Sequence, residues 1–164
     1  LEVVQRFNDR PKVGYSIPDT LGSNADPFSF ALGQSWKEIN DVFQFHLIRK
    51  HLESGIVISE LPEKLALKTS TYYAIRRRLS QHGYDFESIP VKIPLKLHSH
   101  ELAALDSYVS NLTELTWKKA NQHFEQEIIE YLFKQVGYQK TKLAEELNIS
   151  YPTVLQKTKS LKRN

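Results

Sequence analysis

Few side chains in this sequence have the types and spacing that catalysis or metal binding requires. The chain contains no Cys, which excludes disulfides, thiolate metal sites and Cys nucleophiles. His98 and His100 form one close pair, and with Glu101 they supply only two or three of the four ligands that zinc usually takes. The sequence shows no phosphate-binding Gly-rich loop, nucleophile elbow or catalytic triad. We therefore expect no metal, no cofactor and no enzymatic activity.

Positive charge gathers in the stretch KTSTYYAIRRRLSQHG, from Lys68 to Gly83, where three consecutive Arg follow two Tyr and a Thr/Ser cluster. Such a charge block needs either water or a polyanion around it. The net charge of the whole chain is only +3, but residues 36–83 carry +3, residues 117–164 carry +4 and residues 84–116 carry −3. This distribution favours a polyanionic partner for the two basic blocks.

The two basic blocks are related in sequence. Aligned from their Trp residues, with one inserted residue, they share eleven identities, where average residue usage gives about two or three. The identical pairs are Trp36/Trp117, Lys37/Lys118, Asn40/Asn121, Phe43/Phe124, Ile48/Ile129, Gly55/Gly137, Leu61/Leu143, Glu63/Glu145, Leu65/Leu147, Thr71/Thr153 and Leu79/Leu161. The period of about 81 residues is too long for a solenoid and predicts a duplicated module.

Each block is predicted to form a long helix, a break at Gly, and two short helices joined by a tight turn. Apolar residues recur at helical spacing over residues 36–53 and 117–135. Gly55 and Gly137 are expected to end these long helices, because Gly is common just after a helix C-terminus. The apolar stripes are expected to form core or a dimer seam.

Polar residues beside the short helices predict their caps. Ser59 or Thr141 is expected to cap the first short helix of its copy, because a hydroxyl can accept a hydrogen bond from a free N–H at a helix start. Ser150 is expected to cap the last helix of copy two. In copy one, this role is expected to fall to Thr69 or Ser70.

Two short helices joined by a tight turn, with the basic and polar surface on the second, are typical of a helix-turn-helix. The major groove of DNA admits one α-helix, so that helix must expose bondable side chains at its N-terminus and cations for phosphates. Tyr72 is expected in the core and Tyr73 on the surface. The residues expected to contact DNA are Lys68, Thr69, Ser70, Tyr73, Ala74, Arg76, Arg77, Arg78, Ser150, Tyr151, Pro152, Leu155, Gln156, Lys157, Lys159, Lys162 and Arg163.

Both copies resemble the Fis-type helix-turn-helix, which is found in the nucleoid protein Fis and at the C-terminus of enhancer-binding activators of the nitrogen-type sigma factor. Copy two matches the family pattern at Ala144, Leu147, Ile149, Ser150, Thr153 and Val154, and copy one at Leu65, Leu67, Thr71, Leu79 and Gly83. The turn Gly of the family is replaced by Asn148, which tolerates the left-handed conformation, and by Ala66, which does so poorly.

The resemblance implies an all-α fold of two tandem Fis-like modules. We expect residues 1–34 to form a linker or the edge of a missing upstream domain, 35–83 the first module, 84–98 a Pro-containing extended tether, and 99–164 the second module with an extra preceding helix that packs on it. The absence of Met, and so of a start residue, also predicts that the chain is a piece of a longer protein.

The resemblance further implies sequence-specific double-stranded DNA binding by a bacterial transcription regulator, located in the cytoplasm at the nucleoid. The long first helices are expected to pair, either in a homodimer or as an internal pseudo-dimer. A missing upstream ATPase domain would provide contact with RNA polymerase. No membrane association is expected, because no apolar run in the sequence is long enough to span a bilayer.

Two alternatives remain open at this point. The chain would also fit the bipartite DNA-binding region of a transposase or recombinase, in which two unlike helix-turn-helix units read a terminal repeat. Copy one would otherwise be a degenerate module that is kept only for dimerisation or for contact with a partner.

Overall fold

The computed structural model describes residues 26–87 and 93–161. These residues form seven α-helices, two short 3₁₀ helices and no β-strand, so the prediction of an all-α fold is confirmed. Within the same two ranges, no helix combines the length and the apolar character that crossing a bilayer requires. The predicted linker at residues 1–34 lies mostly outside the described residues, as does the middle of the predicted tether.

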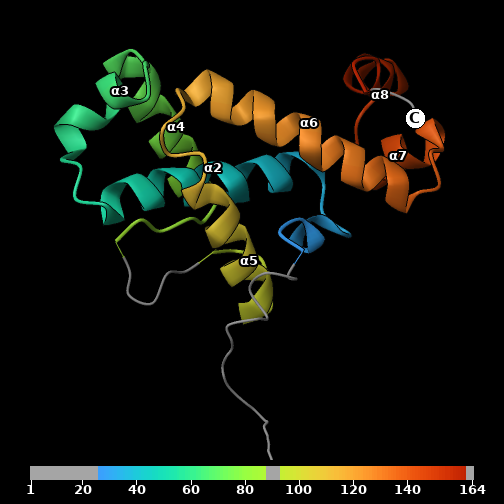
Figure 1. Cartoon of the computed structure of the whole chain (residues 1–164), viewed down its shortest axis with the longest axis horizontal. Coiled ribbons are helices and arrows are strands. Elements are labelled where there is room, and N and C mark those ends of the chain that lie inside the picture. The colour runs from blue at the N-terminus through green and yellow to red at the C-terminus, as the bar shows by residue number, and fades with distance from the viewer. Residues whose placement is uncertain (1–25, 88–92, 162–164) are drawn as a thin grey trace, which may run out of the picture.

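Two similar series of helices follow one another along the chain (Figure 1). The first consists of α2 (Trp36–Glu53), η2 (Ile58–Glu60), α3 (Leu61–Lys64) and α4 (Thr69–Gln81). The second consists of α6 (Trp117–Gln135), α7 (Lys140–Leu147) and α8 (Tyr151–Thr158). The 3₁₀ helix η1 (Ser29–Ala31) precedes the first series, and α5 (Ser99–Ser110) precedes the second.

The helix boundaries follow the sequence repeat. The two long helices begin at aligned Trp residues, and α4 and α8 begin 82 residues apart. Ser35 and Thr116 cap α2 and α6 in the same way, each accepting a hydrogen bond from the backbone N–H three residues later. Asn40 and Asn121 each donate Nδ2 to the carbonyl four residues earlier, both at 2.8 Å. The two copies therefore share local structure as well as sequence.

The two long helices meet at a pair of equivalent Phe residues. The rings of Phe43 and Phe124 are both buried and stack with their centroids 4.0 Å apart and an interplanar angle of 1°. The two positions are aligned in the repeat, so the contact joins equivalent residues of the two copies. Gln44 on α2 also donates Nε2 to Asn121 Oδ1 on α6, at 2.9 Å. The long helices of the two copies thus pair within one chain.

Each long helix also contacts the short helices of the other series. The backbone N–H of Trp117, at the start of α6, donates to the carbonyl of Leu65 after α3, at 2.9 Å. At the start of α2, the ring of Trp36 lies under Lys157 of α8, with Nζ 4.5 Å from the ring centroid. A single hydrophobic core therefore joins the two series.

The extra helix α5 packs on both series, whereas the sequence predicted packing on the second series. It lies mainly against α2, where Lys50 Nζ is 2.6 Å from Asp106 Oδ2. This hydrogen bond raises the pKa of Lys50. Tyr108 of α5 also donates its hydroxyl to Glu127 on α6, at 2.7 Å. The expected contact with the second series is therefore present, but α5 packs mainly against α2.

Some predicted helix ends are confirmed. Gly55 and Gly137 follow the ends of α2 and α6 with φ of 92° and 66°, in the left-handed region that Gly adopts without strain. Ser150 caps α8 by accepting a hydrogen bond from the N–H of Thr153.

The other predicted caps are wrong. Ser59 lies inside η2, and α3 begins only at Leu61 with no side-chain cap. Thr141 lies inside α7, which already begins one residue earlier. Thr69 and Ser70 lie in the first turn of α4 and do not cap it. In each case the helix begins at a different residue from the one that the nearest hydroxyl predicts.

Candidate nucleic-acid interface

The turn between the two short helices has the same backbone in both series. Ala66 and Asn148 occupy equivalent positions with φ of 59° and 56°, both left-handed. The next residue of each turn donates its N–H back into the preceding helix, Leu67 to the Pro62 carbonyl at 2.8 Å and Ile149 to the Ala144 carbonyl at 3.1 Å. The second short helix therefore leaves the first in the same way in both units.

The inner faces of α4 and α8 are buried. On α4, Tyr72 and Leu79 are fully covered, and burial raises the pKa of Tyr72. On α8, Val154 is fully covered, and the buried hydroxyl of Thr158 donates to the Val154 carbonyl at 2.8 Å. The prediction that Tyr72 packs in the core and Tyr73 lies on the surface is confirmed. Each second helix is thereby fixed in rotation about its own axis.

The outer faces of α4 and α8 expose the same five positions. These positions recur at helical spacing, so they form one stripe along each helix. The equivalent pairs are Thr69/Tyr151, Ser70/Pro152, Tyr73/Leu155, Ala74/Gln156 and Arg77/Lys159, and all ten residues are exposed. The structure therefore places these ten residues of the predicted DNA-contacting set on two matching surfaces.

Two of the three consecutive Arg have partners inside the protein. The Arg76 guanidinium lies over the ring of Phe86, 4.5 Å from its centroid. Arg78 hydrogen-bonds Gln44 through Nη2, and its Nε lies 3.7 Å from Asp41 Oδ1. Arg77 is the exposed member of the triplet, although Arg78 also keeps 42% of its side-chain surface open to solvent.

Lys157 on α8 is held in a similar way. Its Nζ lies 3.3 Å from Glu125 Oε1, in addition to its position over the Trp36 ring. Lys68, Ser150 and Lys159 are exposed. The last two predicted contacts, Lys162 and Arg163, lie outside the described residues.

A buried polar group anchors α4 to the long helices. Asp41 on α2 is only 5% exposed, and its Oδ2 lies 2.7 Å from Nδ1 of His82, just after the end of α4. Its other oxygen faces Arg78. Because Gln44 bonds both Arg78 and Asn121, the connection continues from α4 through α2 to α6. The inward cations therefore position the helix that carries the exposed stripe.

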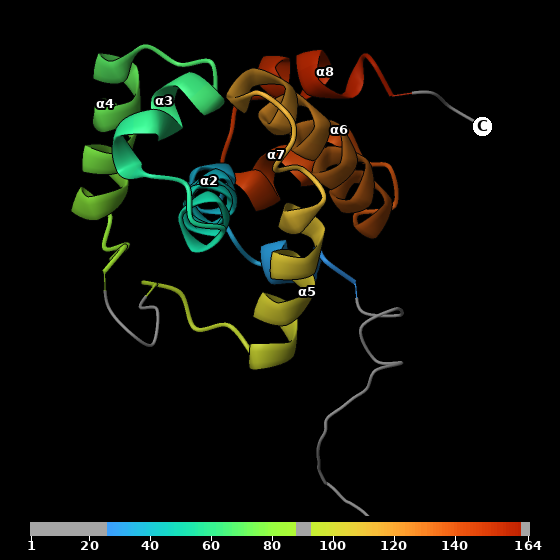
Figure 2. The same ribbon diagram turned by 60° about the vertical axis from the view of Figure 1, so that its left-hand side comes forward.

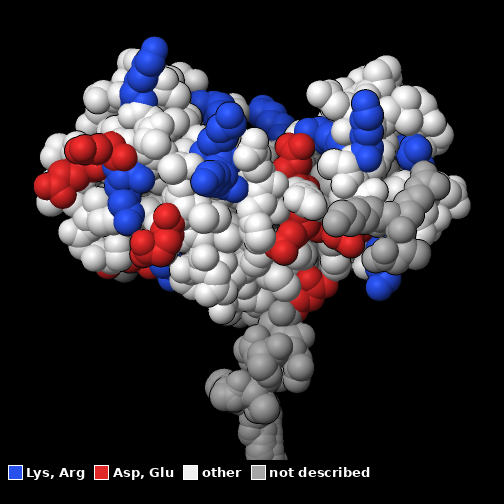
Figure 3. Space-filling view, turned by 45° about the horizontal axis from the view of Figure 1, so that its top comes forward, with Lys and Arg blue, Asp and Glu red and all other residues white. Residues whose placement is uncertain are grey.

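The short helices α3 and α8 lie on the side of the long helices that faces away from α5, and α4 begins on that side (Figures 1 and 2). Viewed towards that side, the surface has two lobes with a hollow between them, and Lys and Arg side chains lie on both lobes and in the hollow (Figure 3). The two exposed stripes thus belong to units on a common side of the molecule.

Sequence reasoning missed two exposed cations close in sequence to the contact between α6 and the α3–α4 turn. Lys118 and Lys119 are exposed at the start of α6, directly after the Trp117 N–H that bonds Leu65 in the α3–α4 turn. They were not predicted as DNA contacts, because the helix that they begin was expected to form core or a dimer seam. We include them among the candidate phosphate contacts.

The histidine pair has a structural place. His98 is the N-cap residue of α5, and its backbone N–H donates to Glu101 Oε1 at 2.9 Å, while its ring stacks on His100 with centroids 5.4 Å apart. Among the described residues, no group of three His, Cys, Asp or Glu side chains is arranged to hold a metal ion.

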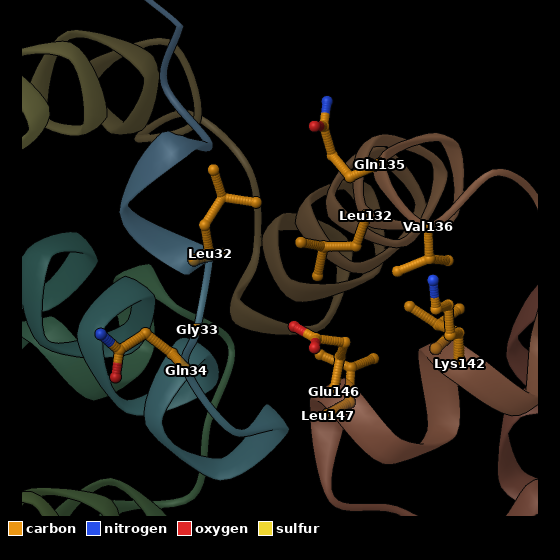
Figure 4. A pocket seen from close by; sticks show the side chains of 11 residues that line it. Leu32, Gly33, Gln34, Leu132, Gln135, Val136, Lys142, Glu146 and Leu147 are labelled. Atoms are coloured by element: carbon orange, nitrogen blue, oxygen red, sulfur yellow. The ribbon is translucent and has the colours of Figure 1, made fainter.

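A cavity of about 290 Å³ lies where the loop before α2 meets α6 and α7 (Figure 4). Gly33 lines it opposite Glu146. The equivalent place in the first series holds Glu114, whose carboxylate lies 3.7 Å from Lys64 Nζ. The Glu114 side chain is 89% exposed, so it fills no comparable space. The cavity beside Gly33 is lined mainly by residues of α6 and α7. Its lining contains no His, Ser or Thr and offers no catalytic arrangement.

No family model, curated protein or solved structure matches the chain. The function of the interface must therefore be inferred from its own residues and geometry.

Proposed function

We propose that this chain binds double-stranded DNA in a sequence-specific manner, with α4 and α8 as its two recognition helices. The observation that carries the proposal is the repeated surface: the same five positions are exposed on the second short helix of both series, and each stripe ends in a cation, Arg77 or Lys159. In proteins that read DNA with this motif, the N-terminal part of the second helix enters the major groove.

The cations of α4 and α8 fall into two groups, exposed and bonded within the protein, and this difference fits a role in DNA binding. Cations that contact phosphates must be exposed, whereas cations that fix the helix must have partners within the protein. Lys68, Arg77 and Lys159 are exposed, and Arg78 and Lys157 bond to the long helices. We therefore revise the predicted set of DNA-contacting residues. The cations that bond within the protein orient the recognition helices, and the exposed cations bind the phosphate backbone of DNA.

The resemblance of both copies to Fis-type modules favours transcription regulation in a bacterial cell as the context of this binding. Two recognition helices of unlike composition on one chain further imply a target of two unlike half-sites, because each half-site would face a different set of side chains.

A salt titration tests the electrostatic part of the proposal. Among the described residues, we propose five exposed cations as phosphate contacts: Lys68, Arg77, Lys118, Lys119 and Lys159. If all five contact phosphates, log K should fall with log salt with a slope of about −4.5. We expect Arg77→Gln and Lys159→Gln each to reduce the steepness of this slope by about 1, measured by fluorescence anisotropy on a duplex of fixed sequence.

The chain offers matched controls for this experiment. Arg78→Gln and Lys157→Gln remove charge of the same sign one or two residues away, but from side chains that bond within the protein. We expect these two variants to lower the free energy of unfolding and to leave the salt slope unchanged. A slope near zero for the unmodified chain, or equal changes in all four variants, would overturn the proposal.

A further inference from the structure

The exposed stripe of α8 begins with three mainly apolar side chains, whereas that of α4 begins with two hydroxyl residues. Tyr151 is 46% exposed, Leu155 is 41% exposed, and Pro152 beside them is also exposed. The equivalent positions on α4 carry Thr69, Ser70 and Tyr73. The two recognition helices therefore present different chemistry at the positions that would lie deepest in the groove.

The hydroxyl groups at the start of α8 are already engaged in the cap. Ser150 Oγ accepts a hydrogen bond from the Thr153 N–H at 3.3 Å, and the two hydroxyls lie 2.7 Å apart. This cap directs both hydroxyls towards the helix backbone. The polar groups that remain on the stripe are the Tyr151 hydroxyl, the Gln156 amide and the Lys159 ammonium.

On the major-groove edge of the base pairs, the apolar group is the C5-methyl of thymine. A Leu or Pro side chain can distinguish thymine from the other bases by contact with this methyl, and a Gln amide can pair with the N6 and N7 atoms of adenine. Apolar and amide side chains thus match neighbouring thymine and adenine bases in the groove.

We propose that α8 recognises its half-site through thymine methyl groups, with Leu155 and Pro152 as the methyl contacts and Gln156 on an adjacent adenine. This inference rests on the proposed function and specifies the substrate of one of its two recognition helices. The half-site of α4, faced by hydroxyl groups and Arg77, does not share this requirement.

An exposed apolar stripe can also be the contact surface for another protein. DNA is favoured here because Leu155 lies between Pro152 and Gln156 on the stripe, and Lys159 continues it one turn later. A polar and a cationic side chain are thus part of the same face, at the positions where α4 carries Ala74 and Arg77.

The test replaces thymidine with deoxyuridine, whose base differs from thymine only in lacking the C5-methyl group. The intact chain is first used to select its preferred site from random-sequence duplexes. Each thymine of that site is then replaced in turn, and binding is measured by fluorescence anisotropy. We expect about fourfold weaker binding for each contacted methyl group removed, the effect of exposing one buried carbon, and no change for replacements outside the site.

Matched variants assign the effect to α8. Leu155→Ala, at an exposed position that is not needed for the core, should bind thymine and deoxyuridine duplexes equally at the position that it contacts. Tyr73→Ala, at the equivalent position of α4, should retain the preference for thymine at the position that Leu155 contacts. The measurement on the unmodified chain stands even if a variant fails to fold.

The outcomes separate this inference from the proposed function. Selection of a defined site that tolerates deoxyuridine at every position would overturn methyl recognition and leave DNA binding by α4 and α8 intact. A preference for thymine that persists unchanged at every position of the site in both Leu155→Ala and Pro152→Ala would overturn the assignment to α8. Failure to select any site, together with a flat salt dependence, would overturn both and favour a protein partner for the stripe.

Discussion

Arg76, Arg77 and Arg78 are neighbours in the sequence but have three different environments, because successive residues of an α-helix point about 100° apart. Arg76 covers the ring of Phe86, Arg77 faces solvent, and Arg78 reaches back to Gln44. Three like charges in a row therefore do not form a single patch. Each has a role set by its direction on the helix.

At the same scale, buried His side chains make the fold sensitive to acid. Burial of the side chain lowers the pKa of His46 to about 4, with the charge of Asp106 opposing this shift and that of Arg49 adding to it. In the unfolded chain this pKa is about 6.5, so the unfolded state binds the proton more readily. Stability should therefore fall as the pH drops from about 6.5 towards 4, by about 2 kcal/mol at pH 5 from this residue alone.

Urea unfolding at pH 7 and pH 5 tests this prediction. His46→Gln removes the titrating group, so the variant should lose less free energy of unfolding between the two pH values than the unmodified chain. Some pH dependence will remain, because burial also lowers the pKa of His51. An identical loss in both proteins would contradict the assignment to His46.

At the scale of the element, the α3–α4 turn holds a residue that is poorly suited to it. Ala66 has φ of 59°, where a Cβ atom is strained, and Asn148 takes the same conformation in the other turn. We expect Ala66→Gly to raise the free energy of unfolding by about 1 kcal/mol, because Gly adopts this conformation without the penalty. Asn148→Gly is the matched control and should give a smaller gain, since Asn tolerates the left-handed region. Thermal unfolding followed by circular dichroism would measure both, and an equal response would contradict the explanation.

The elements show how far the sequence alone could predict this structure. Helical spacing of apolar residues located the long helices, and the repeat located the short ones, because both signals are local or come from comparing two segments. The partners of α5 and of Arg78 could not be predicted in this way. Arg78 bonds Gln44, 34 residues away, and Lys50 on α2 bonds Asp106 of α5, 56 residues away, so these contacts depend on tertiary packing that neither signal contains. For the same reason, the sequence identified the exposed stripe but not the cations that bond inward.

At the scale of the whole molecule, the stacked Phe pair should couple the stability of the two series. We expect Phe43→Leu and Phe124→Leu each to lower the free energy of unfolding by about 1–2 kcal/mol, because Leu fills part of the space but does not stack. The double variant should lose less than the sum, since both changes remove one shared contact. Urea unfolding of the four proteins gives this comparison, and additive losses would argue against coupling through the stack.

The pairing of long helices within one chain also predicts the stoichiometry of the proposed complex. One chain carries both proposed recognition helices on a common side of the molecule, so a single chain should occupy one complete site. We expect a complex of one chain and one duplex in native mass spectrometry of the selected site. A complex of two chains on a duplex of the same length would indicate that each chain uses only one of its helices.

The stacking of Phe43 on Phe124 has a consequence for how such a protein can evolve. When two identical chains associate, every mutation appears in both halves of the assembly, and the two halves cannot change independently. Here the halves are encoded at separate places in one chain, so a mutation in α4 leaves α8 unchanged. The two halves can therefore diverge, and they already differ at the equivalent positions Tyr73 of α4 and Leu155 of α8. A chain with two unlike ends has a direction, and it would lie on its DNA in one orientation and not in the reverse.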